Sequence, residues 1–411
     1  MRRSHGLTEL SNKPLPIIMY HSVGVVDKDW AWNQLTCPFE IFESQLKWLK
    51  KKSFRTLTLT QLREKASHGL MMNGQEVALT FDDGYLDNWT FVYPLLRKFG
   101  FNATLFVCPE FVDSREVIRP TLEDVWNGRI SLTELPTQGY MSWKELTAMA
   151  ADGSANIQSH ALTHTWYPRT GRIIDFRHPG DNYFWMTWNS HPEEKPFLQK
   201  DRNVLVDWGA PVYEHGKALE TRKFFPDPGL GRFLVDEVKS RGGEAFFKGA
   251  WRDALFARVD EYKAQHALQE RYETHEEHEA RIRFELRRSK ELIEQRVNKP
   301  VKFLCWPGGG ISPAALRIAN EEGYEGSTYT SREARIRPLP GKPAGGHIRL
   351  ERIGASLYGS PGTGRKRRAV YLSGPLFILS LYLFQGKQPR AFFSRVVLGA
   401  SKRASMIRDS F

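Results

Sequence analysis

The sequence predicts an α/β protein built on a mostly parallel sheet. Two observations carry this prediction. Short apolar runs with strand character alternate with helical segments along residues 16–165, and chemically reactive polar side chains directly follow two of these runs. Alternating strands and helices are typical of parallel sheets, and in such folds the functional site lies where the strands end. The sequence therefore predicts both the fold class and the edge of the sheet that carries the chemistry.

The first part of the chain supplies these elements in order. Continuous apolar runs predict strands, and apolar residues spaced by three and four positions predict helices. Ser142 also predicts a helix start, because Glu145 follows it at the spacing of a capping box. We expect strands at residues 16–23, 76–81, 103–107 and 154–158, and helices at residues 39–52, 88–99 and 142–151.

The regular alternation stops at Trp166 and resumes near Glu270. The intervening residues are rich in Trp, Pro and Gly and show weak periodicity, so we expect them to form an inserted subdomain or lid. Beyond the insertion we expect a charged helix at residues 270–297, a strand at 301–306, a glycine-rich loop at 307–310 and a helix at 312–322.

The net charge of +12 is concentrated at the carboxyl end. Residues 361–411 contain ten Lys or Arg side chains and one Asp, together with an uncharged stretch at residues 369–386. An apolar segment flanked by basic residues favours contact with a membrane surface. The alternative is a helix that packs on the main domain. Because no nucleic-acid-binding motif accompanies the charge, we expect no nucleic-acid partner.

The three cysteines and the amino terminus bear on the compartment. Cys37, Cys108 and Cys305 are odd in number and widely spaced, which predicts buried, reduced thiols and not a disulfide framework or a zinc ribbon. Residues 1–18 carry basic side chains but no apolar run before Pro14, so we see no secretory signal. We therefore expect a cytoplasmic protein, associated through its basic tail with the inner face of the membrane.

Two acids and two histidines are the candidate chemical centre. Asp82 and Asp83 follow an apolar strand, so one can bind a metal while the other takes a proton from water; an acidic turn is the ordinary alternative. His160 and His164 are four residues apart and can reach one ion, although an isolated pair is more often structural. A carboxylate with two imidazoles forms a three-ligand metal site with open positions, and this combination favours the metal site.

Four segments resemble motifs of a known family. TFDDG at residues 80–84 and SHALTH at residues 159–164 resemble the first and second motifs of the polysaccharide deacetylase family, also called NodB-homology proteins or carbohydrate esterase family four. FLCWPGG at residues 303–309 and YHSV at residues 20–23 resemble segments of one branch of that family.

The resemblance implies a distorted (β/α) barrel, to which the sequence adds the large inserted subdomain and the basic, partly apolar carboxyl-terminal tail described above. It covers residues 16–165 and 281–329. The expected boundaries are 14–165 for the first part of the barrel, 166–270 for the insertion, 271–360 for the second part and 361–411 for the tail.

The resemblance also implies roles for the candidate residues. Asp82 is the expected general base, while Asp83, His160 and His164 are the expected ligands of a divalent metal, usually zinc, with nickel or cobalt as alternatives. The implied reaction is hydrolysis of an N-acetyl group on a hexosamine, with release of acetate. The expected partner is an N-acetylated glycan or glycolipid.

Three features depart from the family pattern. Ala161 stands where Ser or Thr often follows the first histidine, and no arginine that would orient Asp82 is evident near Pro307. The late Leu-x-His segment that supplies the acid is also not evident. His21 is our first candidate for the acid, with a buried structural histidine as the alternative, and His347 is the second candidate.

Substrate contacts are predicted at two places. Trp306, Pro307 and Gly308 are candidates for the lining of the pocket, with core packing as the alternative. Candidate sugar contacts in the insertion are Arg169, Trp185, Trp188, Trp208 and Tyr213.

The sequence also offers one other histidine pair and two alternative functions. His275 and His278 are three residues apart in a charged segment, so we expect a solvated helix face there and not an HExxH metal site. A metal-dependent amidohydrolase acting on a non-sugar C–N bond would share all of the motifs. An inactive glycan-binding module predicts loss of a ligand or of the base, whereas all four residues are present.

Overall fold

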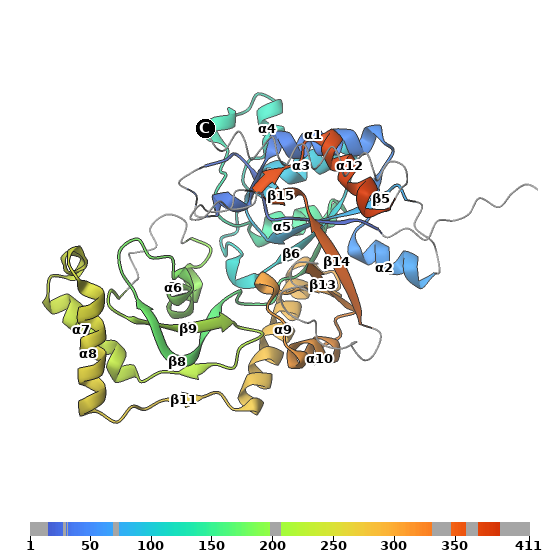
Figure 1. Ribbon diagram of the computed structural model, residues 1–411. Coiled ribbons are helices and arrows are strands. Elements are labelled where there is room, and N and C mark those ends of the chain that lie inside the picture. The colour runs from blue at the N-terminus through green and yellow to red at the C-terminus, as the bar shows by residue number, and fades with distance from the viewer. Residues whose placement is uncertain are drawn as a thin grey trace, which may run out of the picture.

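The computed structural model of the 411-residue chain describes residues 15–27, 30, 32–68, 74–197, 207–330, 347–358 and 369–386. Seven parallel strands in these ranges form a closed barrel in the order β1-β14-β13-β12-β7-β6-β5, and β5 pairs with β1 to complete the circle (Figure 1). The strands are β1 (Ile17–Tyr20), β5 (Glu76–Asp83), β6 (Ala103–Val107), β7 (Ala155–Ser159), β12 (Phe303–Cys305), β13 (Gly326–Thr330) and β14 (Ile348–Gly354). The predicted (β/α) barrel is confirmed.

Helices connect the strands and cover the outside of the barrel. They are α1 (Phe39–Lys51), α2 (Leu59–Ser67), α3 (Tyr93–Phe99), α4 (Leu122–Trp126), α5 (Trp143–Ala151), α9 (His275–Val297) and α10 (Pro313–Glu321). Ser142 caps α5 through the predicted capping box with Glu145. Thr274 caps α9 in the same way, so this helix begins later than the expected residue 270.

Two strand predictions need correction. The run expected as one strand at residues 16–23 divides at His21, because β2 (Ser22–Gly24) leaves the barrel and pairs with β3 (Thr36–Pro38). The strand expected at residues 76–81 continues through both acids to Asp83. β4 (Arg55–Thr56) adds a short pairing to the start of β5.

An apolar layer fills the barrel below the site. Ile17, Phe106, Phe303 and Cys305 form one buried cluster, against which Ile348 and Leu350 of β14 pack. Alternate residues of a strand share a face, so Arg352 continues the series of Ile348 and Leu350. A charged side chain therefore ends an otherwise apolar series inside the barrel.

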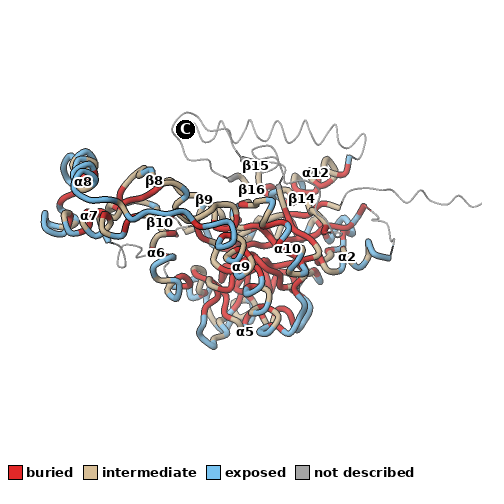
Figure 2. Tube along the Cα trace, turned by 90° about the horizontal axis from the view of Figure 1, so that it is seen from below, coloured by how far each residue is buried: buried red, intermediate tan, exposed pale blue. Residues whose placement is uncertain are grey.

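Residues 166–272 form a body beside the barrel (Figure 1). Its elements are β8 (Trp166–Phe176), α6 (Phe184–Ser190), β9 (Pro211–Lys217), β10 (Phe224–Phe225), α7 (Pro228–Ser240), α8 (Trp251–Gln265) and β11 (Arg271–Tyr272). β8 and β9 form an antiparallel hairpin, and Phe176, Leu230, Leu234 and Leu255 belong to an apolar cluster of their own. The buried segments concentrate in the barrel, whereas α8 is mostly exposed (Figure 2).

The carboxyl-terminal part of the described chain packs on the barrel. β15 (Ser356–Tyr358) pairs with β16 (Ala369–Tyr371), and α12 (Gly374–Phe384) lies on α1 with Phe377, Ile378 and Leu381 buried. Gln45 of α1 donates a hydrogen bond to the Leu372 carbonyl at 2.7 Å. Among the residues with described positions, no helix is both long enough and apolar enough to cross a membrane. The rest of the predicted tail, residues 361–368 and 387–411, lies outside the described residues.

Candidate active site

The two acids at the end of β5 both face one cavity. Consecutive side chains of a regular strand point to opposite faces. Asp83, however, has φ of 73°, a left-handed value that is uncommon for a residue with a side chain. This turn breaks the alternation, and Asp82 and Asp83 both line the same cavity although both are buried. Backbone strain of this kind is often found at functional sites.

Two histidines reach Asp83 from the loop after β7. The Nε2 atom of His160 lies 3.1 Å from Asp83 Oδ1, and the Nε2 atom of His164 lies 3.3 Å from the same oxygen. His160 Nδ1 donates a hydrogen bond to the Cys305 carbonyl at 2.9 Å. Because a carbonyl can only accept, this bond fixes the ring orientation and leaves Nε2 of His160 to bind a ligand.

These three side chains fit a divalent metal. Their ligand atoms all lie within 4.8 Å of one another. Ligands bound at about 2.1 Å in a tetrahedral arrangement are roughly 3.4 Å apart, close to the two distances measured here. Asp83 Oδ1 is also buried and has no hydrogen-bond partner among the described residues. A buried carboxylate oxygen without a partner is costly, and a cation bound at this position would satisfy it.

The three close side chains shift one another's pKa values. Burial would lower the pKa of His160, but Cys305 and Asp83 raise it well above its usual value. Burial would raise the pKa of the Asp83 carboxyl, but the nearby imidazoles of His160 and His164 hold this pKa well below its usual range. Burial lowers the pKa of His164 to about 4. At neutral pH this imidazole is therefore uncharged and can offer a lone pair to a metal.

Arg352 is the partner of Asp82 that the sequence did not reveal. Its Nη1 atom donates to Asp82 Oδ1 at 2.6 Å, and its Nη2 atom donates to Oδ2 at 2.8 Å. The same Nη2 lies 3.0 Å from the Cys305 sulfur. Burial would raise the pKa of the Asp82 carboxyl, but the Arg352 guanidinium outweighs it and holds this pKa below its usual value. The signal in the sequence was an arginine at position 352, where the alternate apolar residues Ile348 and Leu350 would lead one to expect another apolar side chain.

The acids and histidines line a cavity of about 270 Å³. His21 lies at its edge, with Nε2 3.9 Å from Asp82 Oδ2 and a side chain that is 26% exposed. Trp306 and Gly308 also line this cavity. The indole N–H of Trp306 is buried and has no hydrogen-bond partner in the described part of the chain.

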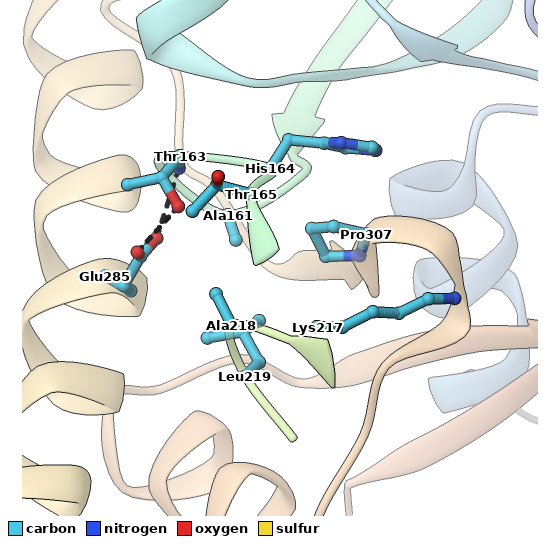
Figure 3. A pocket seen from close by; sticks show the side chains of 9 residues that line it. All are labelled: Ala161, Thr163, His164, Thr165, Lys217, Ala218, Leu219, Glu285 and Pro307. Atoms are coloured by element: carbon cyan, nitrogen blue, oxygen red, sulfur yellow. Dashed lines mark hydrogen bonds between the residues drawn. The ribbon is translucent and has the colours of Figure 1, made fainter. Parts of the chain in front are cut away.

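Pro307 lines a smaller neighbouring pocket, which shares His164 with the site (Figure 3). Lys217 of β9 lies beside this loop, so the insertion reaches the metal-ligand region. Gly308 has φ of 52°, and a Cβ at this position would lie 2.7 Å from Lys217 Nζ. The left-handed backbone favours glycine here, whereas the end of the flexible Lys217 side chain could move away from a Cβ.

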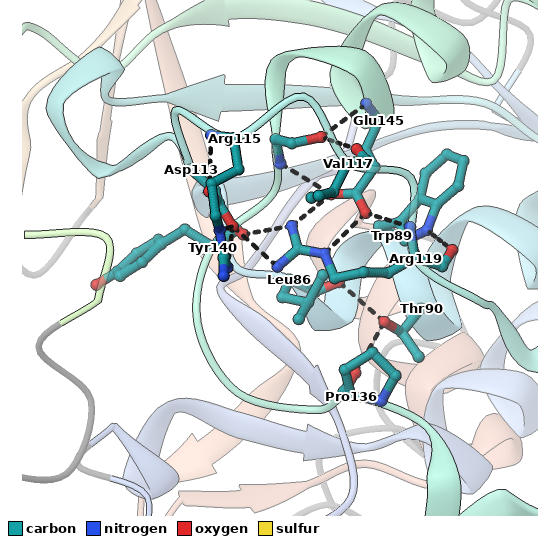
Figure 4. A network of polar contacts seen from close by, with 11 residues as sticks. Leu86, Trp89, Thr90, Asp113, Arg115, Val117, Arg119, Pro136, Tyr140 and Glu145 are labelled. Atoms are coloured by element: carbon teal, nitrogen blue, oxygen red, sulfur yellow. Dashed lines mark hydrogen bonds and ion pairs between the residues drawn. The ribbon is translucent and has the colours of Figure 1, made fainter.

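An aromatic wall surrounds Asp82 and Asp83. It consists of Trp32, Tyr85, Phe111, Tyr140, Trp166, Trp188 and Trp306. Tyr140 stacks on Tyr85 and Phe111, with ring centroids 5.2 and 4.7 Å apart. Arg119 holds the Tyr140 backbone, since it donates to the Tyr140 carbonyl at 2.8 Å and to the buried Glu145 carboxylate (Figure 4).

The candidate sugar contacts in the insertion have different positions. Trp188 lines the cavity, as predicted. Trp185 and Tyr213 are buried within the insertion, and Trp208 packs against its apolar cluster. Arg169 is exposed beside Glu214, at 3.8 Å. These four residues do not line the cavity, whereas Trp32 and Trp166, which the sequence analysis missed, do.

The remaining predictions concern three histidines and the cysteines. His347 precedes β14 and therefore lies at the opposite end of the barrel, bonded to the Tyr324 carbonyl and to Ser327, so it is wrong as a candidate acid. His275 is exposed, but His278 is buried and not on a solvated face. All three cysteines are free and buried, as expected.

Comparison with known proteins gives a family for part of the chain. Residues 71–209 match the family described as polysaccharide deacetylase. A Bacillus subtilis (strain 168) protein named for that family, YxkH, is 38% identical over 93 residues, which are 23% of this chain and 31% of that protein. A poly-beta-1,6-N-acetyl-D-glucosamine N-deacetylase of Escherichia coli (strain K12) is 28% identical over 170 residues, 39% of this chain and 23% of that protein. This chain thus spans less than a third of the length of either relative.

Two solved structures resemble the chain over most of its length. A de-N-acetylase from Aggregatibacter actinomycetemcomitans has 16% identity and a TM-score of 0.48, over 83% of this chain and 95% of that chain. A deacetylase domain from Bordetella bronchiseptica has 18% identity and a TM-score of 0.45, over 83% of this chain and 96% of that chain.

Proposed function

From the match of residues 71–209 to the polysaccharide deacetylase family, we propose that this chain hydrolyses the N-acetyl group of a hexosamine in a glycan or lipid-linked glycan and releases acetate. One observation carries the proposal. The Asp83, His160 and His164 trio lies beside the Asp82–Arg352 pair in a single cavity walled by aromatic rings. This arrangement supplies a metal site, a base and a surface for a sugar within one space.

A divalent metal is part of the proposal. Asp83, His160 and His164 would hold it, with zinc as the first candidate and nickel or cobalt as substitutes. When bound, such an ion makes water a stronger nucleophile and polarises the acetyl carbonyl.

The protein's own residues would move the protons. Asp82 is kept ionised by Arg352 and takes a proton from the attacking water. Water adds to the acetyl carbon, and the C–N bond then breaks. His21 lies on the same side of Asp82 as the cavity and gives a proton to the departing amine. The products are acetate and a free amino sugar.

Aromatic residues would hold the sugar. Trp32 and Trp166 are half-buried and line the cavity, so each has ring surface available for a pyranose ring. The buried indole N–H of Trp306 is a hydrogen-bond donor for a polar group of the substrate. Gly308 allows the substrate to approach the backbone of this loop.

We also propose that the enzyme works at the cytoplasmic face of a membrane. The basic residues that flank the apolar segment in the sequence support this proposal, as do the half-buried apolar side chains of α12, which include Leu379 and Leu383. Sedimentation with vesicles that contain or lack anionic lipid tests it, with a control variant in which residues 365–368 are replaced by Gln. Equal sedimentation with both kinds of vesicle would contradict the proposed membrane contact.

Acetate release tests the main proposal. The substrates are N-acetylglucosamine oligomers and a polyprenyl-linked N-acetylhexosamine, and the proteins are wild type, chelated wild type and Asp82→Asn. Acetate that disappears on chelation and in the variant supports the deacetylase, and the better substrate identifies soluble or lipid-linked glycan. If metal-loaded wild type released no acetate from any of these sugars, an amidohydrolase on a non-sugar C–N bond or an inactive glycan-binding module would replace the proposal.

A further inference from the structure

The loop between β7 and β8 carries both candidate metal-ligating histidines in an unfavourable backbone conformation. Ala161 has φ of 56° and His164 has φ of 47°, both in the left-handed region that side chains rarely adopt. Such strain persists only where surrounding contacts impose it. Contacts from neighbouring elements must therefore hold this loop in place.

Helix α9 holds the loop from one side. Glu285 is fully buried and accepts two hydrogen bonds from Thr163, one from the backbone N–H at 3.1 Å and one from the hydroxyl at 2.7 Å (Figure 3). One turn further along α9, Ser289 donates to the Ala161 carbonyl at 3.0 Å and contacts Ser159 at 2.8 Å. These contacts connect the helix to residues on both sides of His160.

The insertion holds the same loop from the other side. Lys195 has a side chain that is only 1% exposed, and its ammonium group donates to the Thr163 carbonyl at 2.8 Å. The same ammonium group pairs with the Glu110 carboxylate. Thr163 therefore bonds through its N–H and hydroxyl to α9 and through its carbonyl to the insertion, immediately before His164.

The ionisable side chains of Lys195 and Glu285 indicate a role beyond packing. Burying a lysine and a glutamate carries a desolvation cost, and an apolar contact could stabilise the fold as well. Charged groups are instead suited to fixing direction, because each of their bonds has a defined donor and acceptor. Here the bonds fix the peptide units on either side of Thr163, one of which leads directly into His164.

We propose that Lys195 and Glu285 are positioning residues for His164, and that the insertion is thereby part of the metal site. This inference rests on the proposed function only in that a metal binds the Asp83, His160 and His164 trio. It goes beyond that function because it gives residues outside the trio, one of them in the insertion, a role in setting metal affinity and geometry.

Metal binding by the metal-free full-length chain tests the inference. Co²⁺ is the probe, because its visible absorption spectrum reports ligand geometry and a titration gives Kd. The variants are Lys195→Met and Glu285→Met, and the double variant Lys195→Met with Glu110→Gln, which also removes the half-buried carboxylate that Lys195 would leave unpaired. Matched controls are Lys239→Met on α7 and Glu291→Met on α9, both of which replace exposed charges. The melting temperature of each metal-free protein is measured in parallel.

We expect Lys195→Met, Glu285→Met and the double variant to weaken Co²⁺ binding about 10–100-fold and to alter the spectrum, as removal of outer-shell partners does. The controls should match wild type. If Kd and spectrum stay at wild-type values in the three test variants while the melting temperature falls, the two residues only stabilise the fold and the inference is overturned. A wild type that binds Co²⁺ without deacetylating any sugar would defeat the proposed function and leave this inference standing. A wild type that binds no Co²⁺ would overturn both.

Discussion

Arg352 holds both carboxylate oxygens of Asp82, although the two residues are 270 positions apart in the chain. β14 carries the arginine and β5 carries the acid, and β1 lies between these strands in the barrel. The bidentate pair is buried, with the two side chains 5% and 3% exposed. Asp82 is thereby fixed in direction and kept ionised, which are the two properties that a general base needs.

Replacing Arg352 with Met should therefore damage both chemistry and folding. We expect kcat to fall about 100-fold or more, because the base loses its orientation. The acidic limb of the kcat/KM profile should move to higher pH, since the charge that lowers the pKa of Asp82 is gone. The free energy of unfolding should fall by roughly 3–5 kcal/mol, the usual cost of breaking a buried ion pair.

Arg287→Met is the matched control, because this exposed arginine pairs with Glu322 on the outer surface of the barrel. It should leave the pH profile unchanged. An Arg352→Met protein with a wild-type pH profile would show that Arg352 does not set the pKa of Asp82.

Removing a metal ligand should abolish both binding and activity. Asp83→Asn keeps the size of the side chain but removes its charge, so we expect Zn²⁺ affinity to fall by more than ~100-fold, beyond the loss typical of outer-shell changes. Metal content after dialysis, measured by atomic emission, checks this. His275→Ala, at an exposed histidine on α9, should retain the wild-type metal content. Stoichiometric zinc in Asp83→Asn would place the ion elsewhere.

Substrates with different leaving groups can distinguish a general-acid role of His21 from a structural role. His21→Gln should lower kcat for an N-acetyl sugar by about 10²–10⁴-fold, because the departing amine needs a proton. The loss should be much smaller for 4-nitrophenyl acetate, whose phenolate leaves without one. Equal losses for the amide and the ester would contradict the acid role and leave His21 as a positioning or packing residue.

The buried Asp87 carboxyl should make the free energy of unfolding depend on pH. This carboxyl is 3% exposed, and burial raises its pKa to about 6, despite the hydrogen bonds from Ser22 and Asn88. A raised pKa means that the folded state prefers the protonated form. The stabilising effect is therefore full below the unfolded pKa of about 3.9 and is lost as pH rises through 6.

Asp87→Asn mimics the protonated form at every pH. Relative to wild type, we expect this variant to gain about 3 kcal/mol in the free energy of unfolding as pH rises from about 4 to about 7, at roughly 1.4 kcal/mol per pKa unit. Urea denaturation across this range measures the difference. Asp236→Asn, at an exposed acid on α7, should show no such trend. A constant difference between Asp87→Asn and wild type would refute the raised pKa.

The barrel and the metal trio could be predicted from the sequence because their signals are local. The strand before Asp82 is a continuous apolar run, and His160 and His164 lie four residues apart in one loop. Each of these patterns is complete within a few consecutive residues. The two motifs could be assigned to one site because side chains at the ends of parallel strands meet at one edge of the barrel.

The partners of these residues were missed, because the local sequence does not say which side chain lies opposite in the fold. Arg352, Glu285 and Lys195 act on groups 270, 122 and 32 positions away, respectively. The cavity-lining residues of the insertion could not be identified from the sequence for a related reason. Trp185 and Trp188 are three residues apart, yet only Trp188 reaches the cavity, because the packing of α6 decides which ring faces the site.

The insertion begins at β8, two residues after His164, and this junction limits how the protein can be rebuilt. A graft that replaces residues 166–272 with a short turn, or with the insertion of a relative, would remove Lys195 and also Ala218, whose N–H bonds the Thr165 carbonyl. Such a chimaera could keep every metal ligand and still bind metal poorly. Transplanting substrate preference between members of this fold would therefore require Thr163, Lys195 and Glu285 to be exchanged as one unit.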